Sequence, residues 1–401
     1  MFAGLRALPR AGDSVRRFRS FDPPEYVEWK PDGTIVAAYR ERLAQDPVRQ
    51  ALIRGLEPDR LLALYRGLLR FRLHDIMLQR WVKQGVISKA WLGTGEEAVT
   101  IGAVHALRRG DPHTTDVCGP MIRNAGACHE MGVPLAAMLR GYLGTLDGPA
   151  RGRDIHFGDP SCGVVAPVSV VGGVCGVMNG YGLAFQLAGS DRVALTWIGD
   201  GSTKSGEVHE ALNFAAVNRL PLIFVLQNNQ IALGTKLEQH HRGDGFSAWG
   251  KAYGAPLLEA DGNNVLDMHA AALIAVERCR RGEGPVFISA ETFRMGGHAT
   301  HDLREARRIL APELFDYWGR RDPIGLYEEY LATSDVDLAA DGPEGPGPDS
   351  DDRQAVNRSV LGRIEAEVVA EVEAAARNAL ESREHEDAHA PEAGAEGVYA
   401  S

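Results

Sequence analysis

Acidic and amide side chains follow two short apolar segments of this sequence, at places where they could act together. Residues 193–198 and 222–226 are rich in β-branched and other apolar side chains; Gly199-Asp200-Gly201 follows the first and Asn228-Asn229 the second. Carboxylate and amide oxygens are ligands that Mg²⁺ or Ca²⁺ takes together with phosphate oxygens and water. The glycines allow close approach of a bulky anion. The residue types therefore predict a metal-bridged diphosphate site.

The elements that must position these side chains are two buried parallel strands and one helix. Short apolar runs of this kind are typical of strands covered on both faces. Between them, Val208, Leu212 and Ala215 have the spacing of one helical face, and Pro221 ends the helix. A strand-helix-strand unit is a right-handed crossover whose strands end at the same edge of the sheet, where ligands bind.

Either polar motif alone is a common turn, but both motifs around an intact strand-helix-strand unit are far more specific. Together they resemble the thiamine diphosphate motif. Over residues 61–331 the chain is most similar to the α subunit of the decarboxylating component of 2-oxo acid dehydrogenase complexes, of the pyruvate and branched-chain types. The resemblance implies an α/β fold in which a parallel sheet that binds thiamine diphosphate carries helices on both faces.

Composition excludes several other classes of protein. The 401 residues are 44% hydrophobic and 24% charged, enough for a large core, and no apolar run has the length of a membrane span. A formal net charge of −11 argues against a nucleic-acid surface. The five cysteines form no C-x-x-C pair, which favours a reducing compartment and argues against structural zinc.

The domain organisation follows from helical patterns and composition. We expect an N-terminal arm over residues 1–57, a cofactor-binding domain over 58–331, a flexible linker rich in Asp, Gly and Pro over 332–352, and a C-terminal helix and tail over 353–401. Within the central domain, the patterns predict helices over 58–85 and 93–107 and a polar loop over 294–308. Glu96 and Glu97 at the start of the second helix are assigned a structural role through the helix dipole.

The two ends of the chain are expected to serve the cellular location and the partner. Residues 1–20 contain five arginines and one acid, which is typical either of a mitochondrial transit segment or of a bacterial arm that wraps a partner subunit. The second interpretation, with a cytoplasmic location, is favoured. Residues 397–399 resemble a family segment that packs on the partner.

The resemblance also implies the residues that hold the cofactor. Asp200, Asn229 and the backbone carbonyl of Ile231 would bind Mg²⁺, and Gly199 and Gly201 would lie along the diphosphate. Arg123 matches the arginine that holds phosphate oxygens. Ile122 replaces the family's tyrosine, so that one phosphate hydrogen bond is expected to be missing or supplied otherwise. Ser169 and Val171 would contact the aminopyrimidine ring.

Two histidines are the expected catalytic residues. His156 and His298 match family histidines near the reacting carbon, and His298 also counts among the cofactor-binding residues. An ordinary pKa of ~6.5 would suit both for proton transfer. Ala299 stands where animal members carry a phosphorylatable serine, which excludes kinase regulation at that position.

The implied reaction is the oxidative decarboxylation of a 2-oxo acid with acyl transfer to the lipoyl domain of an acyltransferase. Residues 242–245 and 294–298 favour a branched-chain 2-oxo acid over pyruvate. The family's β subunit provides the glutamate beside the aminopyrimidine, so this chain is expected to act only with a β subunit, as two α and two β chains in a multienzyme complex. The alternatives are an acetoin-type thiamine-dependent enzyme, half of a transketolase, or a non-catalytic scaffold subunit. No nucleic acid or membrane is expected as a partner.

Overall fold

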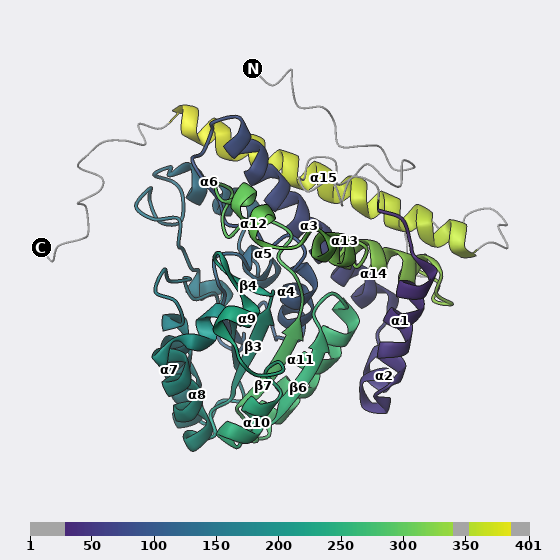
Figure 1. Cartoon of the computed structure of the whole chain (residues 1–401). Helices are drawn as coiled ribbons and strands as arrows, with labels where there is room; N and C mark the ends of the chain where they lie inside the picture. Colours follow the sequence, from purple (N-terminus) through teal and green to yellow (C-terminus); the bar gives the residue numbers. More distant parts are fainter. Residues whose placement is uncertain (1–28, 340–352, 386–401) are drawn as a thin grey trace, which may run out of the picture.

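The computed structural model describes residues 29–339 and 353–385, with a five-stranded parallel sheet at the centre (Figure 1). The strand order is β1-β2-β3-β7-β6, and every neighbouring pair is parallel. The strands are β1 (Val117–Gly119), β2 (Ala194–Gly199), β3 (Leu222–Asn228), β6 (Leu257–Asp261) and β7 (Val286–Glu291). A small antiparallel pair, β4 (Ile231–Ala232) and β5 (Thr235–Lys236), follows β3. The predicted α/β fold with a parallel sheet is confirmed.

The two strands expected at the metal site are neighbours and end together. In the β2–β3 pairing, Ala194 lies opposite Leu222 and Gly199 lies opposite Gln227. The residues that follow, Asp200 and Asn228, therefore lie at one level, where β2 has ended and Asn228 is the last residue of β3. Helix α8 (Gly206–Asn218) connects the strands as predicted, and its Val208, Leu212 and Ala215 are buried.

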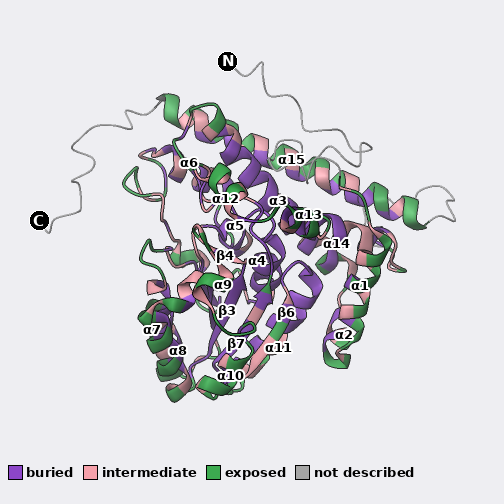
Figure 2. Cartoon of the chain, viewed as in Figure 1, coloured by how far each residue is buried: buried purple, intermediate pink, exposed green. Residues whose placement is uncertain are grey.

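Helices cover both faces of the sheet because side chains alternate along each buried strand. Leu195 and Trp197 point into the core shared with α3 (Pro58–Lys83), α4 (Glu97–Val104) and α11 (Val265–Arg280). Ala194 and Ile198 point into a second core formed with α7 (Gly173–Leu187) and α8. Figure 2 shows the strands as buried, whereas α7 and α8 carry exposed residues along their outer sides.

The remaining helices surround this framework. They are α1 (Gly33–Ala44), α2 (Pro47–Arg54), α5 (Ala125–Met131), α6 (Leu135–Leu143), α9 (Leu237–His240), α10 (Ala248–Tyr253), α12 (Leu303–Ile309), α13 (Pro312–Gly319), α14 (Pro323–Ala332) and α15 (Arg353–His385), with the short 3₁₀ helices η2 (Pro160–Cys162) and η3 (Gly201–Lys204). None of the helices in the described part of the chain is both long and apolar enough to cross a membrane.

The long helix α15 packs across α3 and α6, at the upper edge of Figure 1. Its predicted apolar side is buried and consists of Val360, Leu361, Ile364 and Val368. Ion pairs from Arg66 to Glu367 (2.7 Å) and from Arg70 to Glu371 (3.0 Å) connect it to α3. The side-chain amide of Asn357 donates to the carbonyl oxygens of Leu331 and Val336, so α15 also contacts the first residues of the predicted linker.

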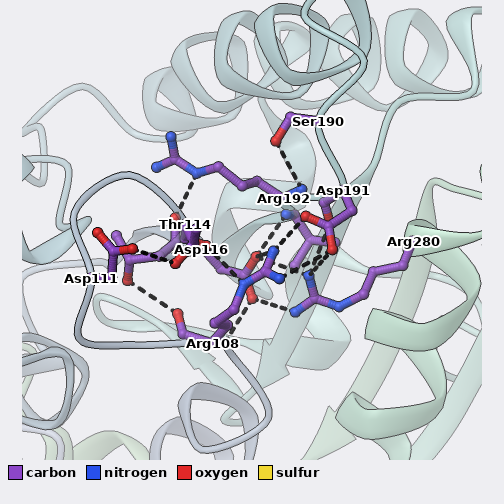
Figure 3. A network of polar contacts seen from close by, with 10 residues as sticks. Arg108, Asp111, Thr114, Asp116, Ser190, Asp191, Arg192 and Arg280 are labelled. Atoms are coloured by element: carbon purple, nitrogen blue, oxygen red, sulfur yellow. Dashed lines mark hydrogen bonds and ion pairs between the residues drawn. The ribbon is translucent and has the colours of Figure 1, made fainter.

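A network of ion pairs joins the amino-terminal ends of β1 and β2 to the end of α11 (Figure 3). The buried Asp116 carboxylate lies 2.7 Å from Arg280 Nη2 and accepts from the Val193 backbone N–H at 2.9 Å. Arg108 donates its backbone N–H to Asp116 (2.7 Å) and pairs with Asp191 (2.7 Å). These contacts stabilise the edge of the sheet opposite the one where Asp200 and Asn229 lie.

Two predicted element boundaries were wrong. The helix predicted over 93–107 begins only at Glu97, because Gly95 has a left-handed φ of 91° that an α-helix cannot include. The loop predicted over 294–308 contains helix α12, which begins after Asp302. The assignments for residues 1–20 and 397–399 lie outside the described residues.

Candidate active site

Asp200 lies at the carboxyl end of β2 and is almost completely buried, with 1% of its surface exposed. Its Oδ2 is 3.2 Å from His240 Nε2. Burial raises the pKa of the Asp200 carboxyl, and the nearby Glu96 charge raises it further, whereas His240 and the Gly201 backbone N–H lower it. Ionisation of this carboxyl therefore costs more free energy here than in water, and a nearby cation would offset that cost. This environment favours binding of a metal ion.

Asn229 follows β3 at the same edge and is also buried. Its Nδ2 donates to Glu96 Oε1 (2.7 Å), and the nearest protein donor to its Oδ1 is the Ile231 backbone N–H at 3.4 Å. The amide oxygen therefore retains a lone pair for another ligand. Ile231, whose backbone carbonyl is the third expected ligand, is buried and donates the N–H of this contact.

Gly201 is required by the packing of the loop after β2. A Cβ atom at this position would lie 2.5 Å from the Ala232 Cβ, closer than two carbon atoms can approach. A Cβ at Gly199 would meet only ordinary contacts, 3.7 Å from Ser202 Oγ. Close packing therefore explains the second glycine of the motif but not the first.

Arg123 is buried behind the same edge and points toward the loop after β7. Its Nη1 donates to the Leu92 carbonyl oxygen (3.0 Å), and its Nη2 lies 3.1 Å from His298 Nδ1 and 3.2 Å from the His298 carbonyl oxygen. Glu96 Oε2 lies 3.5 Å from Arg123 Nη1. Arg123 therefore joins the loop before α4 to the loop that carries His298.

The pKa of His298 is not the ordinary value expected from the sequence. Burial lowers it to about 4, and the charges of Arg123 and Arg294 contribute in the same direction. The ring is therefore neutral at physiological pH. Because a guanidinium only donates, we assign Nδ1 as the acceptor from Arg123 and Nε2 as the protonated nitrogen. His298 can thus donate a hydrogen bond from Nε2, but it is poorly suited to accept and release protons near pH 7.

A second buried arginine, Arg294, comes from the loop after β7 and was not predicted. Its Nε donates to the Gly296 carbonyl oxygen (3.3 Å) and its Nη2 to the Leu233 carbonyl oxygen (2.9 Å), so both acceptors are neutral. The pKa of Arg294 is lowered to about 10, mainly by burial and next by the positive charge of Arg123. Two buried guanidiniums close together favour the binding of an anion.

His156, Ser169 and Val171 form a separate, more exposed part of the predicted site. His156 Nδ1 lies 2.8 Å from Asp154 Oδ1, and its Nε2 lies 3.2 Å from Ser169 Oγ. Val171 is 59% exposed, just before α7. The structure brings His156 and Ser169 together, but neither of them forms a hydrogen bond with Asp200, Asn229 or Arg123 within the described ranges.

The sequence did not identify Glu96, His240 or Arg294 as site residues. Glu96 was assigned to the helix dipole; it is the N-cap residue of α4, but its fully buried carboxylate makes no capping hydrogen bond and instead accepts from Gln227 and Asn229. Glu97 does have the expected structural role, since it accepts from the Gly95 backbone N–H and pairs with Arg72. The weak signal for Arg294 was its position beyond a parallel strand, where α/β sites lie.

The chain fits a magnesium diphosphate group at this edge. Asp200 and Asn229 offer oxygen ligands, while Arg123 and Arg294 offer buried positive charge for phosphate oxygens. Among the described residues, no group of three or more His, Cys, Asp or Glu side chains could hold a metal by itself. A metal bound at Asp200 would therefore require amide, backbone, phosphate or water oxygens to complete its coordination.

Comparison with known proteins gives a consistent result. The family described as "Dehydrogenase E1 component" matches residues 66–340. The 3-methyl-2-oxobutanoate dehydrogenase subunit alpha of Mycobacterium tuberculosis is 33% identical over 302 residues, which cover 75% of each chain. The mitochondrial 2-oxoisovalerate dehydrogenase subunit alpha of Mus musculus is 30% identical over 69% of this chain and 62% of its own length. The pyruvate dehydrogenase E1 component subunit alpha of Acholeplasma laidlawii is 29% identical over 69% of this chain and 76% of its own.

Proposed function

Since the chain belongs to the dehydrogenase E1 component family, we propose that it is the α subunit of a decarboxylating component that acts on a branched-chain 2-oxo acid. Pyruvate is the next candidate, because relatives with either name match at similar identity. The convergence of Asp200, Asn229, Arg123 and Arg294 in the segments that follow β2, β3, β1 and β7 supports this function most directly. A bacterial cytoplasmic location is favoured over the mitochondrial matrix.

Thiamine diphosphate, when bound with Mg²⁺, supplies a nucleophilic carbon and an electron sink for decarboxylation. The metal would be held by Asp200, Asn229 and the Ile231 carbonyl, and Gly199 and Gly201 would border the diphosphate. Arg123 and Arg294 would hold phosphate oxygens. Ser169 and Val171 would face the aminopyrimidine ring, close to the partner chain.

His298 contributes as a hydrogen-bond donor. The Arg123 guanidinium orients its neutral ring, so that Nε2–H is available to stabilise negative charge that develops on the substrate. His156, held by Asp154 and Ser169, would assist at the entrance for the lipoyl group. We propose both as catalytic residues.

A small apolar cavity of about 20 Å³ lies beside these residues, with room for little more than one water molecule. It is lined by Met121, Ile122, Met138, Tyr142, Ile155 and Phe157. Ile122 adjoins Arg123 in the chain and Ile155 adjoins His156, so the cavity lies next to two residues of the proposed site.

Acylation of a lipoyl domain by the purified chain tests the proposal. We expect no activity from the chain alone with saturating thiamine diphosphate and Mg²⁺, and activity once its β subunit is added. Rates with 3-methyl-2-oxobutanoate should exceed those with pyruvate. Robust turnover by the isolated chain would refute the two-subunit requirement, and a cofactor-binding pair that never acylates the lipoyl domain would indicate a scaffold subunit.

A further inference from the structure

A buried carboxylate lies directly behind the proposed metal ligand Asn229. Glu96 is fully buried at the residue before α4 and makes no capping hydrogen bond with that helix. Its Oε1 instead accepts from Asn229 Nδ2 (2.7 Å) and from Gln227 Nε2 (2.5 Å). The acid therefore contacts the end of β3 rather than the backbone of its own helix.

This arrangement determines which atom of Asn229 faces the metal. A side-chain amide can present either its oxygen or its nitrogen to a neighbour, but the Glu96 Oε1 atom accepts hydrogen bonds here, from both Asn229 and Gln227. Asn229 must therefore direct Nδ2 toward Glu96, which leaves Oδ1 on the opposite side. An amide nitrogen cannot bind Mg²⁺, so the reverse orientation would remove a ligand.

Neighbouring side chains hold the second amide of the same network. Gln227 donates Nε2 to Glu96, and its Oε1 accepts from Asn124 Nδ2 at 2.9 Å. Asn124 Nδ2 also lies 2.7 Å from Thr100 Oγ1. Each of these amide nitrogens has an acceptor. The hydrogen bonds to Glu96 therefore fix the orientation of Gln227, and Gln227 in turn fixes the orientation of Asn124.

We propose that Glu96 is a positioning residue for the metal site, which orients the Asn229 amide and holds the Arg123 guanidinium beside it. This inference rests on the proposed function. Glu96 Oε2 has no hydrogen-bond partner among the described residues and lies 3.5 Å from Arg123 Nη1. One acid thus faces both a proposed metal ligand and a proposed phosphate ligand.

Titration of Mg²⁺ by calorimetry into the α–β assembly, saturated with thiamine diphosphate, tests this role without measuring turnover. Glu96→Gln keeps the shape but can present its own nitrogen to Asn229. Loss of such a supporting hydrogen bond typically weakens metal binding by roughly 10–100-fold, and we expect a change in this range. If the wild-type assembly shows no Mg²⁺ binding, the proposed function fails; if Glu96→Gln binds as tightly as wild type, only the positioning role fails.

A double variant in which the acid and the amide exchange positions distinguishes a positioning role of Glu96 from general damage to the structure. Asn229→Asp keeps an oxygen ligand but places a second carboxylate against Glu96, so it should weaken Mg²⁺ binding through repulsion. In the double variant Glu96→Gln with Asn229→Asp, the new amide can donate to the new carboxylate. We expect this double variant to bind Mg²⁺ at least tenfold more tightly than Asn229→Asp alone. No recovery would overturn the proposal.

Glu97→Gln is the matched control, because Glu97 is equally buried at the same helix start but pairs with Arg72. This variant should melt at a lower temperature and retain the wild-type Mg²⁺ affinity. A Glu96→Gln variant that resembles it, with lower stability and unchanged affinity, would show that Glu96 is only a structural acid. The same conclusion would follow if Glu96→Gln failed to fold and Asn229→Asp did not restore it.

Discussion

Replacing Asp200 by Asn should weaken metal binding while leaving the cofactor-free protein at least as stable as before. The side chain is 1% exposed, and burial raises its pKa from the usual 3.8. At neutral pH the folded chain must therefore keep a carboxylate ionised in an environment that stabilises the charge less well than water does. Asn has nearly the same shape and carries no charge, so it removes this cost together with the metal ligand.

The expected magnitude follows from mass action. A ligand present at 100 times its Kd stabilises the folded state by about 2.7 kcal/mol. If the loss of the charged ligand raises Kd about 100-fold, the same concentration stabilises the variant by only about 0.4 kcal/mol. The cofactor-dependent increase in melting temperature should therefore almost disappear.

The pH dependence of the stability of the cofactor-free protein tests the argument from burial independently. A carboxyl with a higher pKa in the folded chain binds more protons when folded, so its contribution to stability is present below the unfolded pKa and is lost as the pH rises through the folded pKa. The variant should therefore exceed wild type in stability at pH 7, and the difference should narrow as the pH falls toward 4.

Differential scanning calorimetry of the α–β assembly, with and without Mg²⁺ and thiamine diphosphate, measures both effects. The substitution also changes the contact between His240 and the Asp200 carboxylate. The stability difference measured at pH 7 therefore includes the effect of that change. A cofactor-dependent shift of wild-type size in Asp200→Asn would refute the metal assignment. A cofactor-free variant much less stable than wild type would refute the argument from burial.

Two further predictions concern catalysis and stability. His298→Ala should lower kcat about 100-fold, which is the usual effect of losing one transition-state hydrogen-bond donor, with little change in the circular-dichroism band of bound thiamine diphosphate. His301→Ala is the control, because His301 is exposed in the same loop, and it should change neither kcat nor the band. An unchanged kcat in His298→Ala would make His298 a structural residue. Arg72→Met should destabilise the chain by roughly 3–5 kcal/mol in denaturant unfolding, because it leaves the buried Glu97 and Asp322 without their ion-pair partner. Arg66→Met, which breaks the exposed pair with Glu367, should cost less than about 1 kcal/mol, and equal effects would contradict this reasoning.

The expected positions of Asp200 and Asn229 could be derived from the sequence because they depend on local patterns. Two apolar runs, a helical face and Pro221 specify a parallel crossover, and parallel strands necessarily end at one edge. The same local information predicted the apolar side of α15, whose residues are buried as expected.

Other features depend on contacts between distant segments and had no local signal. The pKa of His298 is set by burial and by Arg123, which lies 175 residues earlier in the chain. Glu96 has the sequence context of a helix-start acid, yet Gly95 shifts the start of the helix and the carboxylate meets Asn229, 133 residues away.

The sequence by itself determined the class of fold, the crossover and the placement of Asp200 and Asn229 at one edge of the sheet, because repeating patterns of apolar side chains specify strands, helices and the edge where they end. Only the tertiary structure decided the electrostatics of the site. Burial and charge–charge distances lower the pKa of His298 and raise that of Asp200, and those distances exist only once Arg123, Arg294 and Glu96 are brought together by packing.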